Sequence, residues 1–418
     1  MRDELLKKGN IAREAMYKMA TVTTEVKDRA LSEISKALVK NADKIIEANK
    51  LDIENAKANG VRQTMIDRLT LTRDRISSIA KGVDEVCALS DPIGSVKSMW
   101  KRPNGLLIGT KVVPMGVIAI IYEARPNVTV DAAALCLKTS NVCILRGGSD
   151  AINSNKAIME IMQNAAYGVG IPEGALNLVE DTSREASVEL MKMSGYIDML
   201  IPRGGKGLIK SVVENATVPV VETAAGNCHV YVDNEYDADL ATKVILNAKV
   251  QRPSVCNAAE SLLIHKDIAS EFVPVIFDAL IKNNVQIRAD EVSKNIWGKD
   301  NISLATEEDY YTEYNDYIIS VKIVSDINEA IAHINKYNTK HSEAIITTNY
   351  NHSQQFLNEV DAAAVYVNAS TRFTDGFEFG FGAEIGISTQ KMHARGPMGL
   401  DALTSVKYIV YGNGQVRE

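Results

Sequence analysis

The pattern of hydrophobic and polar positions divides the chain into a helical beginning and regions of alternating strands and helices. From Glu4 to about Cys87, apolar residues recur at spacings of three and four, as in ALSEISKALVKNADKIIEANK. This spacing predicts amphipathic helices that pack on a core. Between Gly116 and Val232, β-rich runs such as GVIAIIYE and NVCILRG alternate with helical runs such as KAIMEIMQNAAYGVG. Such alternation predicts a parallel, doubly wound sheet with ligands at the carboxyl ends of its strands.

Further patterns predict a second domain and a projecting arm. Residues 239–368 contain their own apolar strands and helices, which is typical of a separate α/β domain. The run SMWKRPNGLLIGTKVVPMG has two β-like halves around Pro103-Asn104-Gly105, a strong hairpin signal, and LTSVKYIVYGNGQ near the end is another β-like run. We expect that last run to pair with the hairpin of a neighbouring subunit. The predicted parts are a dinucleotide-binding domain (residues 1–98 and 114–224), a second domain carrying the candidate nucleophile described below (225–380), and an oligomerisation arm with the C-terminal return (99–113 and 381–418).

Composition and charge exclude several classes of protein. The chain has 418 residues, of which 46% are hydrophobic and 24% charged, so it is long and apolar enough for two packed domains. Its net charge of -7 comes without a long basic run, which argues against nucleic acid as the main partner. The first residues lack the apolar core of a signal peptide, and no stretch holds eighteen consecutive apolar residues. We therefore expect a cytoplasmic protein that does not enter a membrane.

Cysteine is the residue type with the clearest chemical potential. The chain has 5 cysteines and no CxxC pair, which favours free thiols over a disulfide framework or a metal site. Cys256 follows Gln251-Arg252-Pro253-Ser254-Val255, at a junction where a helical run stops at a proline. A thiolate forms there more readily if Arg252 or backbone amides stabilise its charge. The residues alone leave a second interpretation open, a small buried cysteine without a reactive role.

Polar and glycine-rich segments follow three of the predicted strands. Arg146-Gly147-Gly148-Ser149 and the run Arg203-Gly204-Gly205-Lys206-Gly207 stand where a dinucleotide binds, although neither matches GxGxxG and each can be a simple turn. Arg146 and Lys206 are suited to phosphate groups, and RGGS lacks the acidic residue of an NAD ribose site, which favours NADP. Asn127 follows the first buried strand, where its amide can donate to an oxyanion or simply stabilise its own turn.

Several motifs together resemble a known family over nearly the whole chain. The segments YEARPNVTVDAAALCLKTSN, ILRGGS, IPRGG, AGNCHVYVD, QRPSVCNAAE, HINKYN, AEIGISTQKMHARGPMGL and LTSVKY are similar, in this order, to the aldehyde dehydrogenase superfamily. Within it they resemble the reductases that act on acyl phosphates. The resemblance implies an aldehyde dehydrogenase-like fold, with two doubly wound α/β domains and a β-hairpin and C-terminal arm for oligomerisation.

The resemblance also implies roles for individual residues. Cys256 matches the nucleophile, Asn127 the asparagine of the oxyanion hole, and Glu222 the general base of the hydrolytic members. Positions that match the cofactor site are Arg146, Gly147, Gly148, Ser149, Gly204, Gly205, Lys206 and, for the nicotinamide ribose, Glu313. Residues beside the matched motifs that are suited to an anionic substrate are Arg125, Arg252, Asn257, Lys391, His393 and Arg395.

The activity implied is NADPH-dependent reduction of γ-glutamyl phosphate to glutamate 5-semialdehyde and phosphate through a cysteine thioester, the second step of proline biosynthesis from glutamate. NADP(H) is the expected cofactor, with no metal, and a homodimer or homotetramer that channels substrate from glutamate 5-kinase is the expected assembly. One alternative is an NAD-linked aldehyde dehydrogenase, which Glu222 favours and the segment KMHARGPMGL disfavours. Another is a dinucleotide-binding protein without catalysis, against which the presence of both Cys256 and Asn127 argues.

Overall fold

A computed structural model describes the chain except for residues 1, 124, 224 and 418 and the side chains of Thr64 and Lys206. The described part of the chain forms two compact units, and each is treated by itself. Unit 1 comprises Met1–Thr223, Gly380–Gly386 and Met398–Glu418, and unit 2 comprises Ala224–Phe379 and Ile387–Pro397. The C-terminal return is therefore divided between the units. No helix in the described ranges is long and apolar enough to span a membrane.

Unit 1 begins with the predicted amphipathic helices. They are α1 (Arg2–Met19), α2 (Thr24–Lys40), α3 (Ala42–Ala58), α4 (Gln63–Leu69) and α5 (Arg73–Ala88). Thr23 and Thr72 cap α2 and α5, because their side chains accept the backbone N–H of Val26 and Arg75. The buried residues of α2 recur three and four positions apart, so one stripe of this helix faces α5 and α7 (Ile152–Tyr167).

The core of unit 1 is a parallel sheet with the strand order β5-β4-β3-β6. Its strands are β3 (Val117–Tyr122), β4 (Val142–Arg146), β5 (Leu176–Leu178) and β6 (Met199–Arg203), and the helices between and after them are α6 (Pro126–Lys138), α7 (Ile152–Tyr167), α8 (Arg184–Met191) and α9 (Lys206–Asn215), with a short η1 (Ser149–Ala151). Every residue of β3 is buried, as expected for a strand covered on both faces. Since β3 lies between β4 and β6, the loops after those strands flank the loop that carries Asn127.

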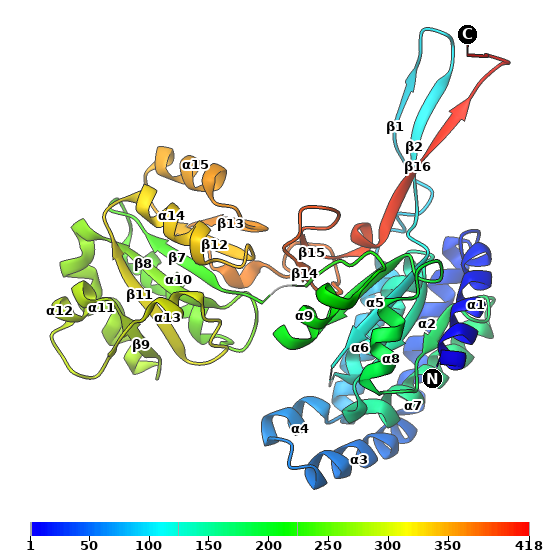
Figure 1. Cartoon of the computed structure of the whole chain (residues 1–418), viewed down its shortest axis with the longest axis horizontal. Coiled ribbons are helices and arrows are strands. Elements are labelled where there is room, and N and C mark those ends of the chain that lie inside the picture. Colours follow the sequence, from blue (N-terminus) through cyan, green and yellow to red (C-terminus); the bar gives the residue numbers. More distant parts are fainter. Residues whose placement is uncertain (1, 124, 224, 418) are drawn as a thin grey trace. The chain divides into compact units, whose positions relative to one another are not determined.

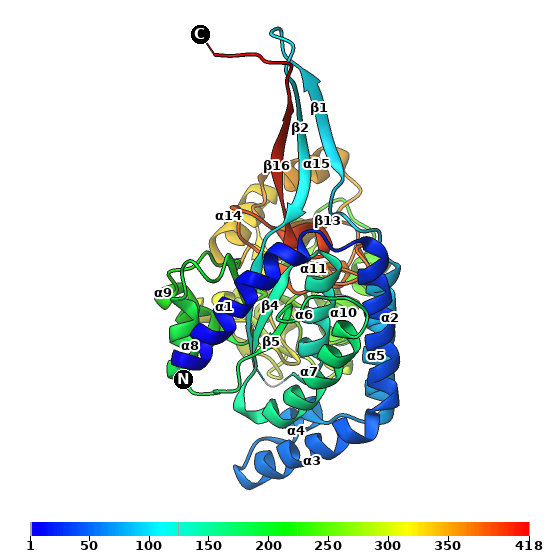
Figure 2. The ribbon, with the colours of Figure 1, turned by 90° about the vertical axis from the view of Figure 1, so that its right-hand side faces the viewer.

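The predicted hairpin is a long arm of unit 1. It consists of β1 (Val96–Lys101) and β2 (Leu107–Pro114), and β16 (Thr404–Tyr411) adds to the other edge of β2 (Figures 1 and 2). The expectation that the last strand pairs with a neighbour's hairpin is wrong for this structure. The short η3 (Leu400–Leu403) precedes β16 directly, so Thr404 starts opposite Pro114 at the base of the chain's own hairpin, and the antiparallel register continues to Tyr411 opposite Leu107.

Unit 2 is built on a second parallel sheet, with the order β10-β9-β11-β8-β7-β12-β13 (Figure 1). The strands are β7 (Cys228–Val232), β8 (Ala259–His265), β9 (Gln286–Ala289), β10 (Ser303–Leu304), β11 (Ile318–Val324), β12 (Ser342–Ile346) and β13 (Ala364–Val367). The helices are α10 (Ala238–Val250), α11 (Lys266–Lys282), α12 (Glu291–Trp297), α13 (Glu307–Tyr311), α14 (Ile327–Tyr337) and α15 (Tyr350–Glu359), and the remaining short elements are η2 (Thr371–Phe373), β14 (Ile387–Ser388) and β15 (Gly396–Pro397).

Alternation along the strands of unit 2 covers both faces of its sheet. Val230 and Val232 pack in one apolar cluster with α10, α11 and α12. Tyr231, between them, packs in another cluster with α14 and α15. Successive side chains of a strand point to opposite faces, so a run of apolar residues buries both sides of β7. Both units therefore have the doubly wound α/β architecture that the sequence predicts.

Candidate active site

Cys256 lies in the connection between α10 and β8 of unit 2, and its backbone is held from the start of β7. The side chain is half-buried. The thiol of Cys228 donates to the carbonyl oxygen of Cys256 at 3.2 Å. A Cβ placed on Gly226 would lie 2.6 Å from the Cα of Cys256 and would overlap its carbonyl group. Only glycine at position 226 allows this approach, so Gly226 and Cys228 together position the main chain of Cys256.

The other cysteines are free thiols with features that disfavour reaction. Burial raises the pKa of the Cys87 and Cys228 thiols, and a hydrogen bond with Cys143 together with burial raises the pKa of Cys136. Because the thiolate is the nucleophilic form, these side chains stay protonated and unreactive at neutral pH. Cys143 is itself fully buried. The half-buried Cys256 is the better candidate for a nucleophile.

Asn257, next to Cys256, is tied to the segment that follows β13. Its side-chain Nδ2 donates to the backbone carbonyl oxygens of Arg372 at 3.3 Å and Thr374 at 3.0 Å. The backbone carbonyl oxygen of Asn257 accepts from the Thr371 hydroxyl at 2.8 Å. The guanidinium of Arg372 in turn donates to Asn257 Oδ1, and its Nε donates to Gln251 Oε1 at 2.9 Å. Asn257 thus connects the Cys256 loop to η2, and its role toward substrate stays a prediction.

Arg372, Gly226 and Cys228 are residues that sequence reasoning missed. Arg372 follows β13 within five residues, as Arg146 ends β4, so the search for basic residues at the carboxyl ends of strands would have found it. No comparable signal marks Gly226, because the close approach that requires glycine exists only in the folded chain. The same holds for Cys228, whose partner lies 28 positions away.

Glu313 lies after α13 and also supports the Cys256 loop. Its Oε1 accepts the backbone N–H of Gly226 at 2.7 Å, which fixes the residue that packs on Cys256. In the two elements that the Cys256 loop connects, Lys249 of α10 and Glu260 of β8 form an ion pair at 2.6 Å in which both side chains are fully buried. Burial raises the pKa of Glu260 to about 7, against the opposing charge of Lys249. The predicted contact of Glu313 with a nicotinamide ribose stays a prediction.

The Asn127 loop of unit 1 follows β3. Asn127 is half-buried in the first turn of α6, and its Nδ2 donates to Asp131 Oδ2 at 3.0 Å, one turn further along. Burial raises the pKa of Asp131 to about 6. This bond uses one of the two amide hydrogens and fixes the side chain, and the predicted role of the other hydrogen toward an oxyanion stays a prediction. Arg125, the N-cap residue of α6, is exposed in the same loop.

The two glycine loops lie on either side of that loop. Arg146 is buried, and its guanidinium donates to the carbonyl oxygens of Thr182 and Ser183, the latter at 2.8 Å, while its Nε has no partner among the described residues. Burial lowers the pKa of Arg146. Gly147 packs against Tyr122 and Asn155 so closely that a Cβ would not fit. Gly148 and Ser149 follow it at the start of η1.

The second loop precedes α9. Gly205 is the N-cap residue of α9, and its N–H donates to Glu123 Oε2 at 2.9 Å. A carboxylate therefore lies at the helix N-terminus, the place where a phosphate group would bind. A Cβ on the neighbouring Gly204 would lie 2.7 Å from the carboxyl carbon of Glu123. The side chain of Lys206, also predicted to serve a phosphate, lies outside the described residues.

The remaining predicted residues differ in how they are engaged. Lys391 and Arg395 both bind Asp361, at 2.8 and 2.6 Å, and these contacts hold the pKa of that carboxyl well below its usual range. His393, between them, is exposed, as is Arg252 beside the Cys256 loop. Glu222 is half-buried and precedes Thr223, the last residue of the first segment of unit 1. In the described ranges no group of His, Cys, Asp and Glu side chains is arranged to hold a metal ion.

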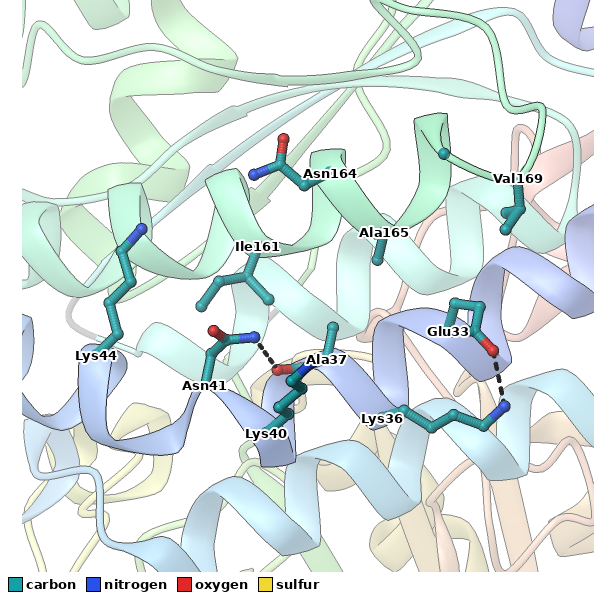
Figure 3. A pocket seen from close by; sticks show the side chains of 11 residues that line it. Glu33, Lys36, Ala37, Lys40, Asn41, Lys44, Ile161, Asn164, Ala165 and Val169 are labelled. Carbon is teal, nitrogen blue, oxygen red and sulfur yellow. Dashed lines mark hydrogen bonds and ion pairs between the residues drawn. The ribbon is translucent and has the colours of Figure 1, made fainter.

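A hollow of about 460 Å³ on unit 1 lies apart from these predicted residues. Figure 3 shows its lining, which comes from α2, α3 and α7 and the turn after α7. Lys36 pairs with Glu33 at 2.7 Å, and the Asn41 amide donates to the Ala37 carbonyl at 2.8 Å. The lining includes none of the residues that sequence reasoning selected, so we do not assign the hollow to the active site.

Comparison with known proteins agrees with this architecture. Residues 3–295 and 313–409 match the aldehyde dehydrogenase family. The γ-glutamyl phosphate reductases of Clostridium perfringens (strain 13 / Type A) and Caldicellulosiruptor bescii are 59% and 57% identical to the chain, over 417 and 418 residues, with 100% of both chains covered in each case. The crystal structure of γ-glutamyl phosphate reductase from Thermotoga maritima matches with a TM-score of 0.97 at 50% identity, over 99% of this chain and 100% of that one.

A more distant structure shares the fold alone. An acetylating aldehyde dehydrogenase from Geobacillus thermoglucosidasius matches with a TM-score of 0.69 at 16% identity, over 100% of this chain and 98% of that one. The family resemblance predicted from the motifs is confirmed. The chain belongs to the aldehyde dehydrogenase family, in the branch of the γ-glutamyl phosphate reductases, and is an oxidoreductase.

Proposed function

We propose that the chain reduces γ-glutamyl phosphate to glutamate 5-semialdehyde, with release of inorganic phosphate and oxidation of NADPH, as the reductive step of proline biosynthesis. The observation that carries the proposal is full-length identity of 59% with a relative named for this activity. The chemistry of unit 2 supports it, because the half-buried Cys256 has its backbone fixed by Gly226 and Cys228. A fixed backbone holds a nucleophile in one attacking position.

In the proposed reaction the Cys256 thiolate attacks the acyl carbon of the substrate. The C–O bond to phosphate then breaks, its electron pair leaves with the phosphate, and a thioester to Cys256 remains. The Asn127 amide and the backbone N–H of Cys256 stabilise the oxyanion that precedes this step. When bound, the nicotinamide supplies a hydride to the acyl carbon. The C–S bond then breaks, so that one acyl phosphate, one hydride and one proton yield one aldehyde and one phosphate, and the thiolate is restored.

The cofactor site that we propose uses the loops of unit 1. Gly147 and Gly148 with Ser149 follow β4, and Gly204 and Gly205 with Lys206 follow β6, so both groups stand at carboxyl ends of parallel strands. The fit is supported by the unpartnered Nε of Arg146 and by the open space around Gly207, where an added Cβ would meet no atom within 4 Å. The basic Arg146 favours NADPH over NADH, and Glu313 serves the nicotinamide ribose.

Assembly and location complete the proposal. The arm carries exposed apolar side chains, among them Trp100, Tyr408 and Val410, which are suited to contact with another copy of the chain. We propose a homodimer or homotetramer in the cytoplasm that receives its substrate from glutamate 5-kinase. Arg125, Asn257, His393 and Arg395 are proposed to contact the amino acid part of that substrate. Glu222 is not proposed to activate water, because water would hydrolyse the thioester before reduction; its proposed roles are to deprotonate the thiol of Cys256 or to hold a hydrogen bond.

The test couples the chain to a glutamate 5-kinase that produces the unstable acyl phosphate in place, and follows oxidation of NADPH. We expect a signal that requires the kinase, ATP and glutamate, and that disappears in the variant Cys256→Ala. Cys87→Ala removes a half-buried thiol of unit 1 and is the matched control, with activity unchanged. Absence of a signal above background contradicts the proposed function.

The reverse reaction separates this proposal from a hydrolytic aldehyde dehydrogenase. In reverse, glutamate 5-semialdehyde is oxidised by NADP+, and phosphate is the group that cleaves the thioester. We expect the rate to depend on added phosphate. Oxidation at full rate without phosphate would instead identify a hydrolytic enzyme in which Glu222 activates water.

A further inference from the structure

Arg372 forms hydrogen bonds with the Cys256 loop on both sides of the nucleophile. Its Nε donates to Gln251 Oε1 at 2.9 Å, and a terminal nitrogen donates to Asn257 Oδ1. Gln251 precedes Cys256 by five positions and Asn257 follows it directly. A guanidinium that spans these two partners lies alongside the short segment between them. It uses two of its five N–H groups there, so three remain for a further acceptor.

A second arginine stands in the same segment. Arg252 is exposed and directly follows Gln251. In the part of the chain that the structure describes, neither Arg252 nor Arg372 forms an ion pair with a carboxylate, whereas Arg288 binds Asp309 at 2.5 Å. The pKa of Arg372 is lowered by burial first and by the positive charge of Arg252 next, and the neighbouring Cys256, Asp375 and Cys228 act in the opposite direction. Both guanidinium groups therefore lie within electrostatic reach of each other and, in the case of Arg372, of the nucleophile.

Arg252 is exposed and Arg372 is half-buried, so their like charges repel each other across the protein surface, where the effective dielectric is lower than in bulk water. Elsewhere in unit 2 a cluster of positive charges has an acidic partner. Asp361 forms ion pairs with Lys340, Lys391 and Arg395. Near Cys256 the charge of Asp375 acts on Arg372, but in the described part of the chain no carboxylate forms an ion pair with either arginine. An anion from solution would remove the repulsion and use the remaining N–H groups.

We propose that Arg372 and Arg252 form a phosphate subsite beside Cys256, which binds the phosphoryl group of the acyl phosphate and holds it as it leaves. This proposal rests on the proposed function and names the part of the site that recognises the leaving group. When the C–O bond breaks, its electron pair moves to the phosphate oxygen, and negative charge grows there. A planar guanidinium fork matches phosphate oxygens in pairs, so Arg372 stabilises that charge while it braces the loop.

The experiment measures alkylation of Cys256 by iodoacetamide, followed by mass spectrometry, against increasing inorganic phosphate. Chloride at the same ionic strength is the control for screening. We expect phosphate, and not chloride, to slow alkylation of the unaltered protein. The variant Arg252→Gln should raise the half-protecting phosphate concentration about tenfold or more, since a charged hydrogen-bonding partner is lost. Lys243→Gln removes an exposed cation of α10 in the same unit and should change nothing.

Variants at Arg372 separate its two roles. Arg372→Gln loses the charge, and Arg372→Lys keeps the charge but loses the fork. We expect protection by phosphate to be lost in the first and weakened in the second, with circular dichroism of both unchanged. If the arginines had only a structural role in the loop, phosphate would protect Cys256 in Arg252→Gln as well as it does in the unaltered protein. The subsite is overturned if the half-protecting phosphate concentration of Arg252→Gln stays within twofold of that of the unaltered protein. It is also overturned if chloride protects Cys256 as well as phosphate does.

Alkylation needs neither cofactor nor turnover, so the subsite and the proposed function fail separately. Phosphate protection without NADPH oxidation in the coupled assay would retain the subsite and remove the function. NADPH oxidation without selective protection by phosphate would do the reverse. In the active enzyme, Arg252→Gln should raise the KM for the acyl phosphate more than it lowers kcat, because the group binds the phosphoryl end in both ground and transition states.

Discussion

Substitution of Gly226 by alanine tests how strongly the position of Cys256 depends on its neighbours. The added Cβ would lie 2.6 Å from the Cα of Cys256, where ordinary contact begins at 3.4 Å, and it would overlap the carbonyl group as well. The two backbone segments must therefore separate by about 0.8 Å or more, and overpacking of this kind destabilises a protein by about 1–3 kcal/mol. A nucleophile displaced by about 1 Å can lose about 100-fold in rate. We expect activity to fall about 100-fold, equivalent to about 2.7 kcal/mol, while a protein destabilised by about 1–3 kcal/mol stays folded in the assay.

The assay for Gly226→Ala compares steady-state reduction, iodoacetamide labelling of Cys256 and urea unfolding. Gly82 in α5 provides the matched control, because a Cβ there would meet no atom within 4 Å. Gly82→Ala should keep full activity and gain about 0.5–1 kcal/mol in unfolding free energy, as alanine does in a helix interior. If Gly226→Ala retains more than about a third of the activity, the contact with Cys256 does not position the nucleophile.

Three further predictions concern a carboxyl beside Asn127 in unit 1 and two groups near Cys256 in unit 2. Burial raises the pKa of Asp131 to about 6 in the folded protein, whereas its pKa in the unfolded chain is near 4. The stability contributed by the protonated Asp131 is therefore complete below about pH 4 and is lost as the pH rises through about 6. Asp131→Asn should therefore be more stable than the unaltered protein by about 1–3 kcal/mol at pH 8 and equal at pH 4 in urea titrations; equal stability at both pH values would contradict the shifted pKa. Lys249→Met should lose about 1–3 kcal/mol, because Glu260 is left buried without its partner and must take up a proton. Glu260→Gln added to it should restore at least half of that loss, and an unchanged unfolding free energy in Lys249→Met would contradict the role of the pair. Cys228→Ala should lower kcat by about three- to tenfold with a stability loss near 1 kcal/mol, and an unchanged kcat would mean that its thiol does not orient the nucleophile's carbonyl.

The Lys249 and Cys228 predictions also separate fold from function. Lys249 and Glu260 are fully buried in the two elements that the loop connects, so their loss should appear in the unfolding free energy before it appears in kcat. Cys228 contacts the carbonyl oxygen of Cys256 directly, so its loss should appear first in kcat. A lower unfolding free energy with unchanged kcat in the Cys228 variant would contradict its role in positioning Cys256. A lower kcat with unchanged unfolding free energy in the Lys249 variant would contradict the structural role of the ion pair.

Local patterns were sufficient for the fold because they reflect forces that act along the chain. The three-and-four spacing before Cys87 predicts helices, and α1 to α5 occupy that region. The continuous apolar run of residues 117–122 predicts a strand buried on both faces, as β3 is. The hairpin turn at Gly105 needs a positive φ, here 90°, which glycine adopts without strain. Pairing of the last strand was predicted with the wrong partner, because strand pairing depends on where the chain returns and not on the strand's own residues.

The candidate site shows the opposite balance. Its motifs could be recognised in the sequence, and Cys256 could be chosen among the cysteines because its surroundings resemble those of a family nucleophile. What only the tertiary structure decided is which residues hold that cysteine: Gly226, Cys228 and Arg372 lie up to 116 positions away and contact its loop only after the sheet of unit 2 forms. Sequence alone determined the types of side chain and their local elements, since propensity and periodicity are properties of neighbouring residues. Contacts between distant residues depend on the packing of whole elements, and that packing assigned Arg372 a place beside the nucleophile that its sequence position does not reveal.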